Sequence, residues 1–197
     1  KRIALWQKIN TRAGDLHISA CLITKNEAGE LGRWLDNVRV FADEIIVTDT
    51  GSTDDTVAIA RAGGAKVLHF AWIDDFSAAR NFTLAAAQGD WIVFIDTDEY
   101  FDKPECVRYL LAEVDCCRED TEAVMVTSPN IDADKHNREI NRYMVARIFR
   151  HLPYLRYKDR IHESIQRVED GGLSVFIDAE RILLYHTGYS TNRIVAK

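Results

Sequence analysis

In the first half of the chain, apolar and polar positions follow two alternating patterns. Four short apolar runs are typical of buried strands. They occupy residues 16–24, 44–48, 66–70 and 91–95. Between these runs, apolar residues recur every three or four positions, which predicts helices over residues 31–41, 54–62 and 76–88. Strands that alternate with helices indicate a mainly parallel sheet covered on both faces, so the expected fold class is α/β.

The pattern changes after Pro104. One more helix is expected over residues 106–116, and the segment 129–139 is polar and predicts turns. Extended chain is expected over residues 123–128, 142–149, 160–168 and 181–185. We therefore expect a smaller antiparallel C-terminal part joined to the first sheet. The prediction is a single domain over residues 1–197, taken from a longer chain.

Composition and charge narrow the class of protein. Hydrophobic residues make up 47% of the chain and charged residues 28%, which is enough apolar material for a folded core. The net charge of −6 argues against a nucleic-acid-binding surface. No apolar run approaches the roughly 20 residues of a membrane-spanning helix, so a cytoplasmic location is expected, with peripheral membrane association left open. The cysteines form no Cys-x-x-Cys pair and are expected to be reduced.

Three carboxylates directly follow the fourth apolar run. Asp96, Asp98 and Glu99 come after residues 91–95, and side chains two positions apart on a strand point to the same side. Asp96 and Asp98 are therefore expected to face one point in space, where two anions repel each other unless a cation lies between them. The predicted occupant is a divalent ion that also holds phosphate oxygens, whereas Glu99 is expected to face solvent.

Other polar residues lie at the ends of the predicted strands. Thr24, Asn26 and Asp49 follow the first and second apolar runs. Ligands of parallel α/β sheets bind beyond the carboxyl ends of the strands, so these residues and the two aspartates are expected to form one site. Arg80 lies among alanines on the third predicted helix, where its planar guanidinium would suit a diphosphate or a carboxylate.

Four short motifs occur in an order and spacing that resemble family 2 glycosyltransferases of the GT-A fold. Three of them are Lys25-Asn26-Glu27, Asp49-Thr50-Gly51-Ser52 and Asp96-Thr97-Asp98. In the second motif, Thr50 replaces the second aspartate of the family's usual Asp-Asp-Gly-Ser stretch. The fourth, Trp-Ile-Asp-Asp-Phe-Ser-Ala-Ala-Arg-Asn over residues 72–81, is similar to a subgroup with lipopolysaccharide-core glucosyltransferases and peptide S-glycosyltransferases. Some members of that subgroup are fused to tetratricopeptide repeats.

The resemblance implies an enzyme that moves a sugar from a nucleotide-diphosphate donor, with a UDP-sugar expected. The implied acceptor is a glycan, a lipid-linked or lipopolysaccharide-core sugar, or a peptide, and the transfer is expected to invert the sugar carbon. Residues 16–100 would form the nucleotide-sugar-binding half and residues 101–197 the acceptor-binding half. In the family, Asp49 accepts a hydrogen bond from the donor base, and the loop that contains Thr24, Asn26 and Glu27 contacts the nucleoside.

The resemblance also implies a metal site and its ligands. Asp98 would hold Mn²⁺ or Mg²⁺ directly, and Asp96 would contact the donor ribose or reach the metal through water. Arg80 would approach the donor. His186, in the stretch Leu-Tyr-His-Thr-Gly-Tyr, would complete the metal site, and an imidazole ligand favours Mn²⁺ without excluding Mg²⁺. The alternative for His186 is a structural histidine beside a strand.

Glu163 is the candidate general base. Transfer with inversion requires a carboxylate or imidazole that takes the acceptor proton on the face opposite the leaving diphosphate. His162 and Asp159 are the next candidates for this role. The alternative for Glu163 is a surface pair with the nearby Arg160.

Arginines gather in the second half of an otherwise acidic chain. They would line an acceptor groove for an anionic substrate such as a phosphorylated core sugar, or they would be solvated residues on strands. These residues are Arg142, Arg147, Arg150, Arg156 and Arg160.

Two other functions stay open at this point. A haloacid-dehalogenase-type phosphatase would use Asp96 as nucleophile and Asp98 as acid, but its catalytic strand normally opens the fold, and here three strand–helix units come first. A non-catalytic nucleotide- or carbohydrate-binding module would keep the fold without turnover. A Rossmann oxidoreductase is disfavoured, because no Gly-x-Gly-x-x-Gly follows the first predicted strand.

Overall fold

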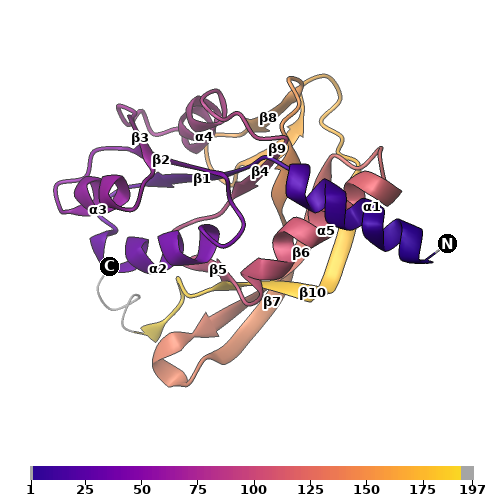
Figure 1. Ribbon diagram of the computed structural model, residues 1–197. Helices are drawn as coiled ribbons and strands as arrows, with labels where there is room; N and C mark the ends of the chain where they lie inside the picture. The colour runs from indigo at the N-terminus through magenta and orange to yellow at the C-terminus, as the bar shows by residue number, and fades with distance from the viewer. Residues whose placement is uncertain (1, 192–197) are drawn as a thin grey trace.

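The first half of the chain folds as alternating strands and helices, as the apolar pattern predicts (Figure 1). The computed structural model describes residues 2–191. Its first four strands are β1 (Ile18–Thr24), β2 (Glu44–Asp49), β3 (Lys66–His69) and β4 (Trp91–Phe94). The helices between them are α2 (Ala28–Val38), α3 (Thr56–Ala62) and α4 (Phe76–Leu84). β1 pairs in parallel with β2 and β4, and β2 pairs in parallel with β3.

The second half adds antiparallel strands to the same sheet. Its elements are β5 (Glu99–Phe101), α5 (Pro104–Cys117), β6 (Ala123–Asp132), β7 (Arg138–Arg150), β8 (Leu155–Lys158), β9 (Ser164–Arg167) and β10 (Val175–His186). Within residues 2–191, the main sheet has eight strands in the order β3-β2-β1-β4-β7-β6-β10-β5. β8 and β9 form a separate antiparallel pair. The expected α/β fold with a smaller antiparallel C-terminal part is confirmed.

Alternating side chains of the central strands build a core on each face of the sheet. From β4 and the residue after it, Trp91, Val93 and Ile95 pack on one side, whereas Ile92 and Phe94 pack on the other. The first core is closed by α2, α3, α5 and the N-terminal helix α1 (Arg2–Asp15), and the second by α4, β8 and β9. Burial on both faces explains why these strands are continuous apolar runs in the sequence.

Several predicted boundaries are wrong. Residues 129–139 are not mainly turns, because β6 and β7 form a long hairpin interrupted only around the short 3-10 helix η1 (Ala133–Lys135). The polar side chains of Asn130 and Asp132 on β6 are buried and hydrogen-bonded, to His186 and Thr191 respectively, so they are compatible with a strand. On β7, residues 138–139 are exposed. The helix expected over 76–88 ends at Leu84. Only the end of the segment 160–168 is a strand, and α1, β5 and β8 were not expected.

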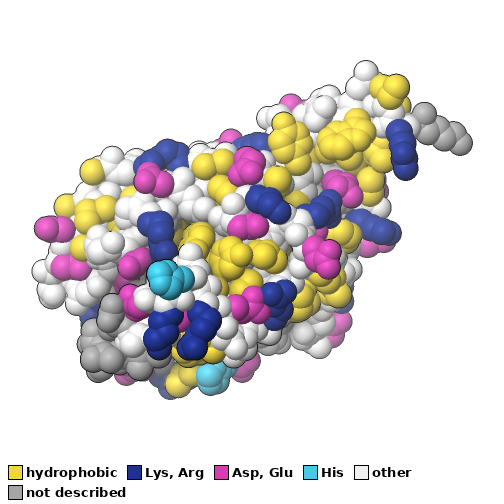
Figure 2. Space-filling model, turned by 90° about the horizontal axis from the view of Figure 1, so that it is seen from below, with side chains coloured by type: hydrophobic (Ala, Val, Ile, Leu, Met, Phe, Trp, Pro, Cys, Tyr) yellow, Lys and Arg dark blue, Asp and Glu magenta, His cyan; other side chains and the backbone are white. Residues whose placement is uncertain are grey.

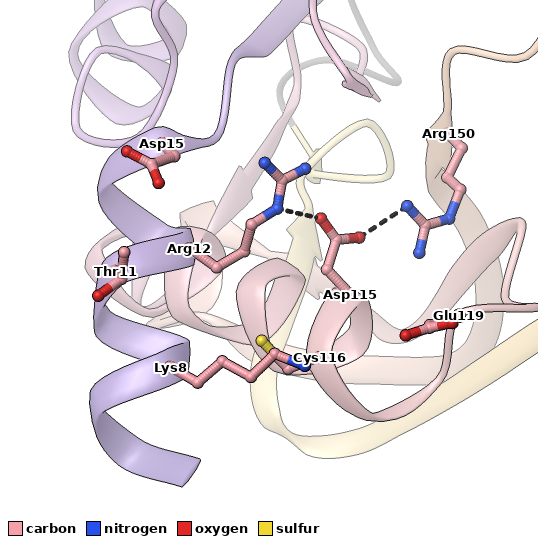
Figure 3. A pocket seen from close by; sticks show the side chains of 8 residues that line it. All are labelled: Lys8, Thr11, Arg12, Asp15, Asp115, Cys116, Glu119 and Arg150. Carbon is pink, nitrogen blue, oxygen red and sulfur yellow. Dashed lines mark hydrogen bonds and ion pairs between the residues drawn. The ribbon is translucent and has the colours of Figure 1, made fainter. Parts of the chain in front are cut away.

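A buried carboxylate holds α1 against α5 (Figure 3). Asp115 on α5 accepts a hydrogen bond from Arg12 Nε at 2.6 Å, and its second oxygen lies 2.7 Å from Arg150 Nη1. The same oxygen accepts from Trp91 Nε1 at 3.1 Å. One side chain therefore joins α1, α5, β4 and β7. The cavity drawn in Figure 3 lies at the amino end of β4, away from the carboxyl ends where ligands of such sheets bind.

The surface mixes charges of both signs. On the face seen in Figure 2, basic and acidic side chains are interspersed, and hydrophobic side chains gather on the projecting end that contains α1. Ile3, Leu5 and Trp6 are the exposed apolar residues of this helix. None of the helices among residues 2–191 combines the length and the apolar character that crossing a bilayer requires.

Replacing Asp115 with asparagine is expected to lower the free energy of unfolding by about 1–3 kcal/mol, because two guanidinium groups lose an anionic partner. Urea-induced unfolding followed by circular dichroism measures this loss. Asp36→Asn is the matched control, since Asp36 is 80% exposed and its pair with Arg39 is worth at most about 1 kcal/mol. Equal losses in the two variants would contradict the assigned role of Asp115.

Candidate active site

A cavity of about 310 Å³ opens at the carboxyl ends of β1 and β4. Its wall combines residues from the first-strand loop, α4, the turn after β4, the loop before β9 and the end of β10. They are Ile23, Thr24, Lys25, Glu27, Phe76, Arg80, Asp96, Thr97, Asp98, Glu163 and His186. The fold therefore brings together most of the candidates from the sequence, which come from both halves of the chain.

Asp96 and Asp98 lie on a tight turn and not on a strand. β4 ends at Phe94. The Glu99 amide donates to the Asp96 carbonyl at 2.9 Å, and the Asp96 amide donates to the Glu99 carboxylate at 2.8 Å, which closes the turn. The expectation that the two aspartates face one point from the same strand is wrong, because that alternation requires extended chain. Asp96 faces α4 and β7, whereas Asp98 faces the end of β10.

Two buried arginines hold the Asp96 carboxylate. Arg80 Nη2 donates to Oδ1 at 2.9 Å, and Arg147 Nη2 donates to Oδ2 at 2.7 Å. Arg80 Nε also donates to Glu163 at 2.7 Å, and Arg147 Nη2 donates to Glu99 at 2.9 Å. Arg80 is 3% exposed and Glu99 is 1% exposed. Two cations and three carboxylates thus form one network, which we call the Asp96 network.

Burial and charge oppose each other within the Asp96 network. Burial alone would raise the pKa of Asp96, but Arg147 and Arg80 hold it well below its ordinary value. The pKa of Glu99 is raised instead, because burial and the charge of Asp96 outweigh its contact with Arg147. The Arg80 guanidinium also lies over the Phe94 ring, with 4.7 Å between its central carbon and the ring centre. Asp96 is therefore a fixed anion that orients both arginines.

Asp98 and His186 meet at the edge of the cavity. His186 is the last residue of β10, and its register with Glu99 in β5 brings it beside the turn. Its Nε2 lies 3.5 Å from Asp98 Oδ2, and both side chains are about one-fifth exposed. Burial would lower the pKa of His186, but the Asp98 carboxylate raises it overall. His186 Nδ1 is hydrogen-bonded to Asn130 Oδ1, which leaves Nε2 directed at Asp98.

The Asp98–His186 pair fits a divalent ion that takes its other ligands from a substrate. A carboxylate oxygen and an imidazole nitrogen both bind ions such as Mn²⁺. Gly188 keeps the space between them open, since a Cβ there would lie 2.6 Å from His186 Nε2 and 2.7 Å from Asp98 Oδ2. Among residues 2–191, no three His, Cys, Asp or Glu side chains converge on one point, so the described part of the chain offers two ligands.

An aromatic slot adjoins the cavity. It has a volume of about 190 Å³, shares Thr24, Lys25 and Phe76 with the cavity, and is closed by Trp72. The Trp72 and Phe76 rings meet edge to face with 4.8 Å between their centres. Trp72 Nε1 donates to Asp74 at 2.8 Å, which fixes the indole. A planar, partly apolar ligand group could lie in this slot beside the end of β1.

Asn26 and Asp49 brace the turns behind the cavity wall. Asn26 has a positive φ of 56°, and its side-chain oxygen accepts from the Thr53 amide at 2.7 Å. The Asp49 carboxylate accepts from the amides of Gly51 and Ser52. Burial would raise the pKa of Asp49, but these bonds lower it. Neither residue lines the cavity, and their predicted contacts with a nucleoside remain predictions.

Glu163 belongs to the loop before β9, and it reaches the cavity wall because α4 holds this loop in place. Ser77 Oγ donates to the Asp159 carbonyl at 2.6 Å, and the Phe76 amide donates to the Arg160 carbonyl at 3.1 Å. The alternative of a surface pair between Glu163 and Arg160 is wrong, since Glu163 pairs with the buried Arg80. Arg160 instead donates to backbone carbonyls in the loop before α4.

The predicted arginine groove does not form. Arg142 pairs with Glu139, Arg150 pairs with Asp115 on the far side of the sheet, and Arg156 donates to backbone carbonyls. Arg147 alone among them belongs to the site, as part of the Asp96 network. The expectation that Glu99 faces solvent is also wrong. A signal for Arg147 does exist in the sequence, because it is a charge within an apolar strand and so requires a buried partner.

Comparison with known proteins identifies the family of this chain. The model of the family described as "Glycosyl transferase family 2" matches residues 19–183. A TPR repeat-containing protein of Synechococcus elongatus is 38% identical over 75% of this chain and 35% of its own length. The prophage-derived glycosyltransferase SunS of Bacillus subtilis is 30% identical over 91% of this chain and 42% of its own length. An uncharacterized glycosyltransferase of Rickettsia felis is 45% identical over 44% of this chain and 30% of its own length. The chain thus spans less than half of these relatives.

Solved structures also resemble this chain, and they too match only part of each protein. The glucosyl-3-phosphoglycerate synthase of Mycobacterium tuberculosis, in complex with Mn²⁺, uridine diphosphate and glucosyl-3-phosphoglycerate, is 28% identical with a TM-score of 0.51. The match covers 62% of this chain and 47% of the synthase. The same synthase has also been solved with Mg²⁺ and uridine diphosphate.

Replacing Arg147 with methionine is expected to cost about 3–5 kcal/mol of unfolding free energy, because the buried Glu99 loses its cation and the one-third exposed Asp96 keeps only Arg80. Arg142→Met on the same strand is the control. Arg142 is more than half exposed and pairs only with Glu139 at the surface, so about 1 kcal/mol or less is expected. Denaturant unfolding of both variants measures the difference. A loss for Arg147→Met no larger than for the control would show that the Asp96 network is not needed for stability.

Proposed function

The chain belongs to glycosyltransferase family 2, and we propose that it transfers a sugar from a UDP-sugar to an acceptor nucleophile, with a metal ion and with inversion. The observation that carries the proposal is the Asp98–His186 pair, which opens on the cavity at the strand ends with 3.5 Å between its facing atoms. The complexes of the synthase with Mn²⁺ or Mg²⁺ and uridine diphosphate support the choice of metal and nucleotide. The family match overturns the phosphatase alternative.

In this proposal, Asp98 and His186 hold the metal ion, and the donor diphosphate supplies further ligands. When bound, the ion neutralises the charge that develops on the diphosphate as the sugar leaves. Both oxygens of Asp96 are already engaged by Arg80 and Arg147, so we assign Asp96 the role of orienting Arg80 at the cavity wall. Among residues 2–191, the buried Arg80 Nη1 has no hydrogen-bond partner, which supports a role for this guanidinium toward a donor phosphate.

The nucleoside would extend from the cavity into the aromatic slot. Trp72 and Phe76 offer an apolar contact for a pyrimidine ring, and Thr24 and Lys25 line both spaces. Asp49 ends the adjacent strand, and its predicted hydrogen bond to the base remains part of this proposal. We keep residues 16–100 as the donor-binding half and residues 101–197 as the acceptor-binding half.

Glu163 is the proposed general base. Its carboxylate lines the cavity, is 12% exposed, and is oriented by Arg80 Nε at 2.7 Å. The acceptor oxygen or sulfur would attack the anomeric carbon, the bond to the diphosphate would break, and the acceptor proton would pass to Glu163. Fixing the carboxylate before the acceptor arrives lowers the reorganisation that the transition state requires.

We further propose that this domain works together with tetratricopeptide repeats. The relative named for TPR repeats supports fused or partner tetratricopeptide repeats, and SunS supports a glycosyltransferase domain of this kind within a longer chain. The acceptor types predicted from the sequence were a glycan, a lipopolysaccharide-core sugar and a peptide. The location proposed from the sequence is the cytoplasm, with peripheral membrane association left open.

A thermal-shift panel tests the donor and the metal together. At about 100 times the dissociation constant, UDP with Mn²⁺ should stabilise the folded state by about 2.7 kcal/mol, and so raise the Tm by roughly 5–10 °C. Asp98→Ala should remove the part of the shift that requires Mn²⁺, whereas Asp120→Ala, an exposed residue away from the cavity, should retain it. A wild-type shift in Asp98→Ala, or no shift with any nucleotide diphosphate, would refute the proposed site.

The general base is tested by the slow hydrolysis of UDP-glucose, in which water replaces the acceptor. Glu163→Gln should reduce the release of UDP at least about 100-fold while UDP still binds with a thermal shift, because the glutamine oxygen can still accept from Arg80 Nε. Glu169→Gln, an exposed residue in the following turn, is the control and should release UDP at the wild-type rate. An unchanged rate in Glu163→Gln would exclude it as base. If the wild-type protein binds UDP-glucose but releases no UDP, even with acceptors present, the result would favour a non-catalytic binding module.

A further inference from the structure

The hairpin of β6 and β7 carries a polar and aromatic surface that continues from the metal edge of the cavity. Asn130 on β6 contacts both His186 and Asn141 on β7 through its side-chain amide. Tyr143 lies two residues further along β7, opposite Ser128 in the strand register. Tyr189 packs edge to face on His186 with 5.4 Å between the ring centres. We call Asn130, Asn141, Tyr143 and Tyr189 the acceptor shelf.

The two tyrosines of the acceptor shelf are available to a ligand. Tyr143 is 41% exposed and Tyr189 is 53% exposed, which are high values for rings beside a buried charge network. Burial of the remainder of Tyr143 raises its pKa, and the charge of Glu99 and the nearby Tyr189 contribute to the same shift. Tyr143 therefore lies near both the Asp96 network and Tyr189. Exposed aromatic faces bind apolar C–H faces, and the asparagine amides bind hydroxyl groups.

The charges around the acceptor shelf disfavour an anion. Arg147 is engaged by two carboxylates, and Arg142 is paired with Glu139. At the far end of the hairpin, Arg138 stands opposite Asp132 in the strand register. On the cavity side, Asn130 and Tyr189 contact His186, whose Nε2 lies 3.5 Å from Asp98.

Lys25 lines the cavity but comes from the first-strand loop, on the side of the aromatic slot. The described part of the shelf thus offers an anionic acceptor no unpaired cation beside His186.

We propose that the acceptor shelf binds an uncharged sugar ring, which stacks on Tyr143 and Tyr189 and presents a hydroxyl group to Glu163. This inference rests on the proposed function, because it identifies the acceptor of the same site. Pyranose rings combine an apolar face with peripheral hydroxyl groups, and this is the combination of contacts that two tyrosines and two asparagine amides provide. A phosphorylated sugar would find no unpaired arginine or lysine beside His186 among residues 2–191, and the proposed metal ion would already be engaged by Asp98, His186 and the donor diphosphate.

Saturation-transfer NMR on the protein with UDP and Mn²⁺ tests this inference. The probes are methyl glycosides of common hexoses, the 6-phosphates of the same sugars, and a neutral peptide that contains serine and cysteine. Saturation of ring protons is expected for at least one neutral glycoside and is expected to be weaker for its 6-phosphate. Tyr143→Ala and Tyr189→Ala should each weaken the binding about threefold to tenfold. Tyr143→Phe should retain it, because the ring persists.

Tyr109→Ala is the matched control, since Tyr109 is 51% exposed but lies on α5. UDP binding is measured on every variant, and Tyr143→Ala should bind UDP as the wild type does, because Tyr143 does not contact His186 in the strand register. Stronger saturation of the 6-phosphates or of the peptide, no saturation of any neutral glycoside, or no effect of either tyrosine substitution would overturn the inference while UDP binding upholds the proposed function. If UDP fails to bind, the proposed donor is wrong. The comparison of glycosides, 6-phosphates and peptide, repeated without nucleotide, then still shows whether the acceptor shelf binds an uncharged sugar.

Discussion

The buried ion pairs around Asp96 are the constraint on which the candidate site depends. Asp96 engages Arg80 from α4 and Arg147 from β7, and through them it fixes Glu163 and Glu99. These charges would be costly to bury singly, but together they are mutually compensated and hydrogen-bonded. The two halves of the chain are thereby held in one arrangement at the carboxyl ends of the strands. A defect in one member leaves another charge uncompensated, so the network behaves as a unit.

The same constraint separates the tasks of the two aspartates. Because the turn after β4 directs Asp96 inward, its carboxylate is committed to the arginines, and Asp98 is left beside His186. The meeting of Asp98 with His186 further requires the antiparallel pairing of β5 with β10 and the absence of a side chain at Gly188. Orientation of the proposed general base and formation of the proposed metal site would therefore both follow from one local fold, which links stability to the proposed chemistry.

The hairpin of β6 and β7 connects the interior of the site to its surroundings. One of its strands supplies Arg147 to the buried network, and the other supplies Asn130 to His186. Further along, β7 carries Asn141 and Tyr143 of the acceptor shelf. A single long hairpin thus spans the distance from fixed charges to open surface, which explains why polar residues persist along strands that also contribute to a core.

The sequence alone determined the first half of the fold and several residues of the candidate site, but it placed Asn26 and Asp49 at a cavity that they do not line and did not place Arg147 beside Asp96. Continuous apolar runs at 16–24 and 91–95 required strands buried on both faces, and parallel strands bring their carboxyl ends to one edge, so Thr24, Asp96 and Asp98 were predictable. The tertiary structure decided which charges neutralise one another. Whether Asp96 faces a metal ion or Arg147, and whether Glu163 faces Arg160 or Arg80, depends on contacts between residues far apart in the chain. Local periodicity carries no information about such pairs, because it records only which side of an element is buried.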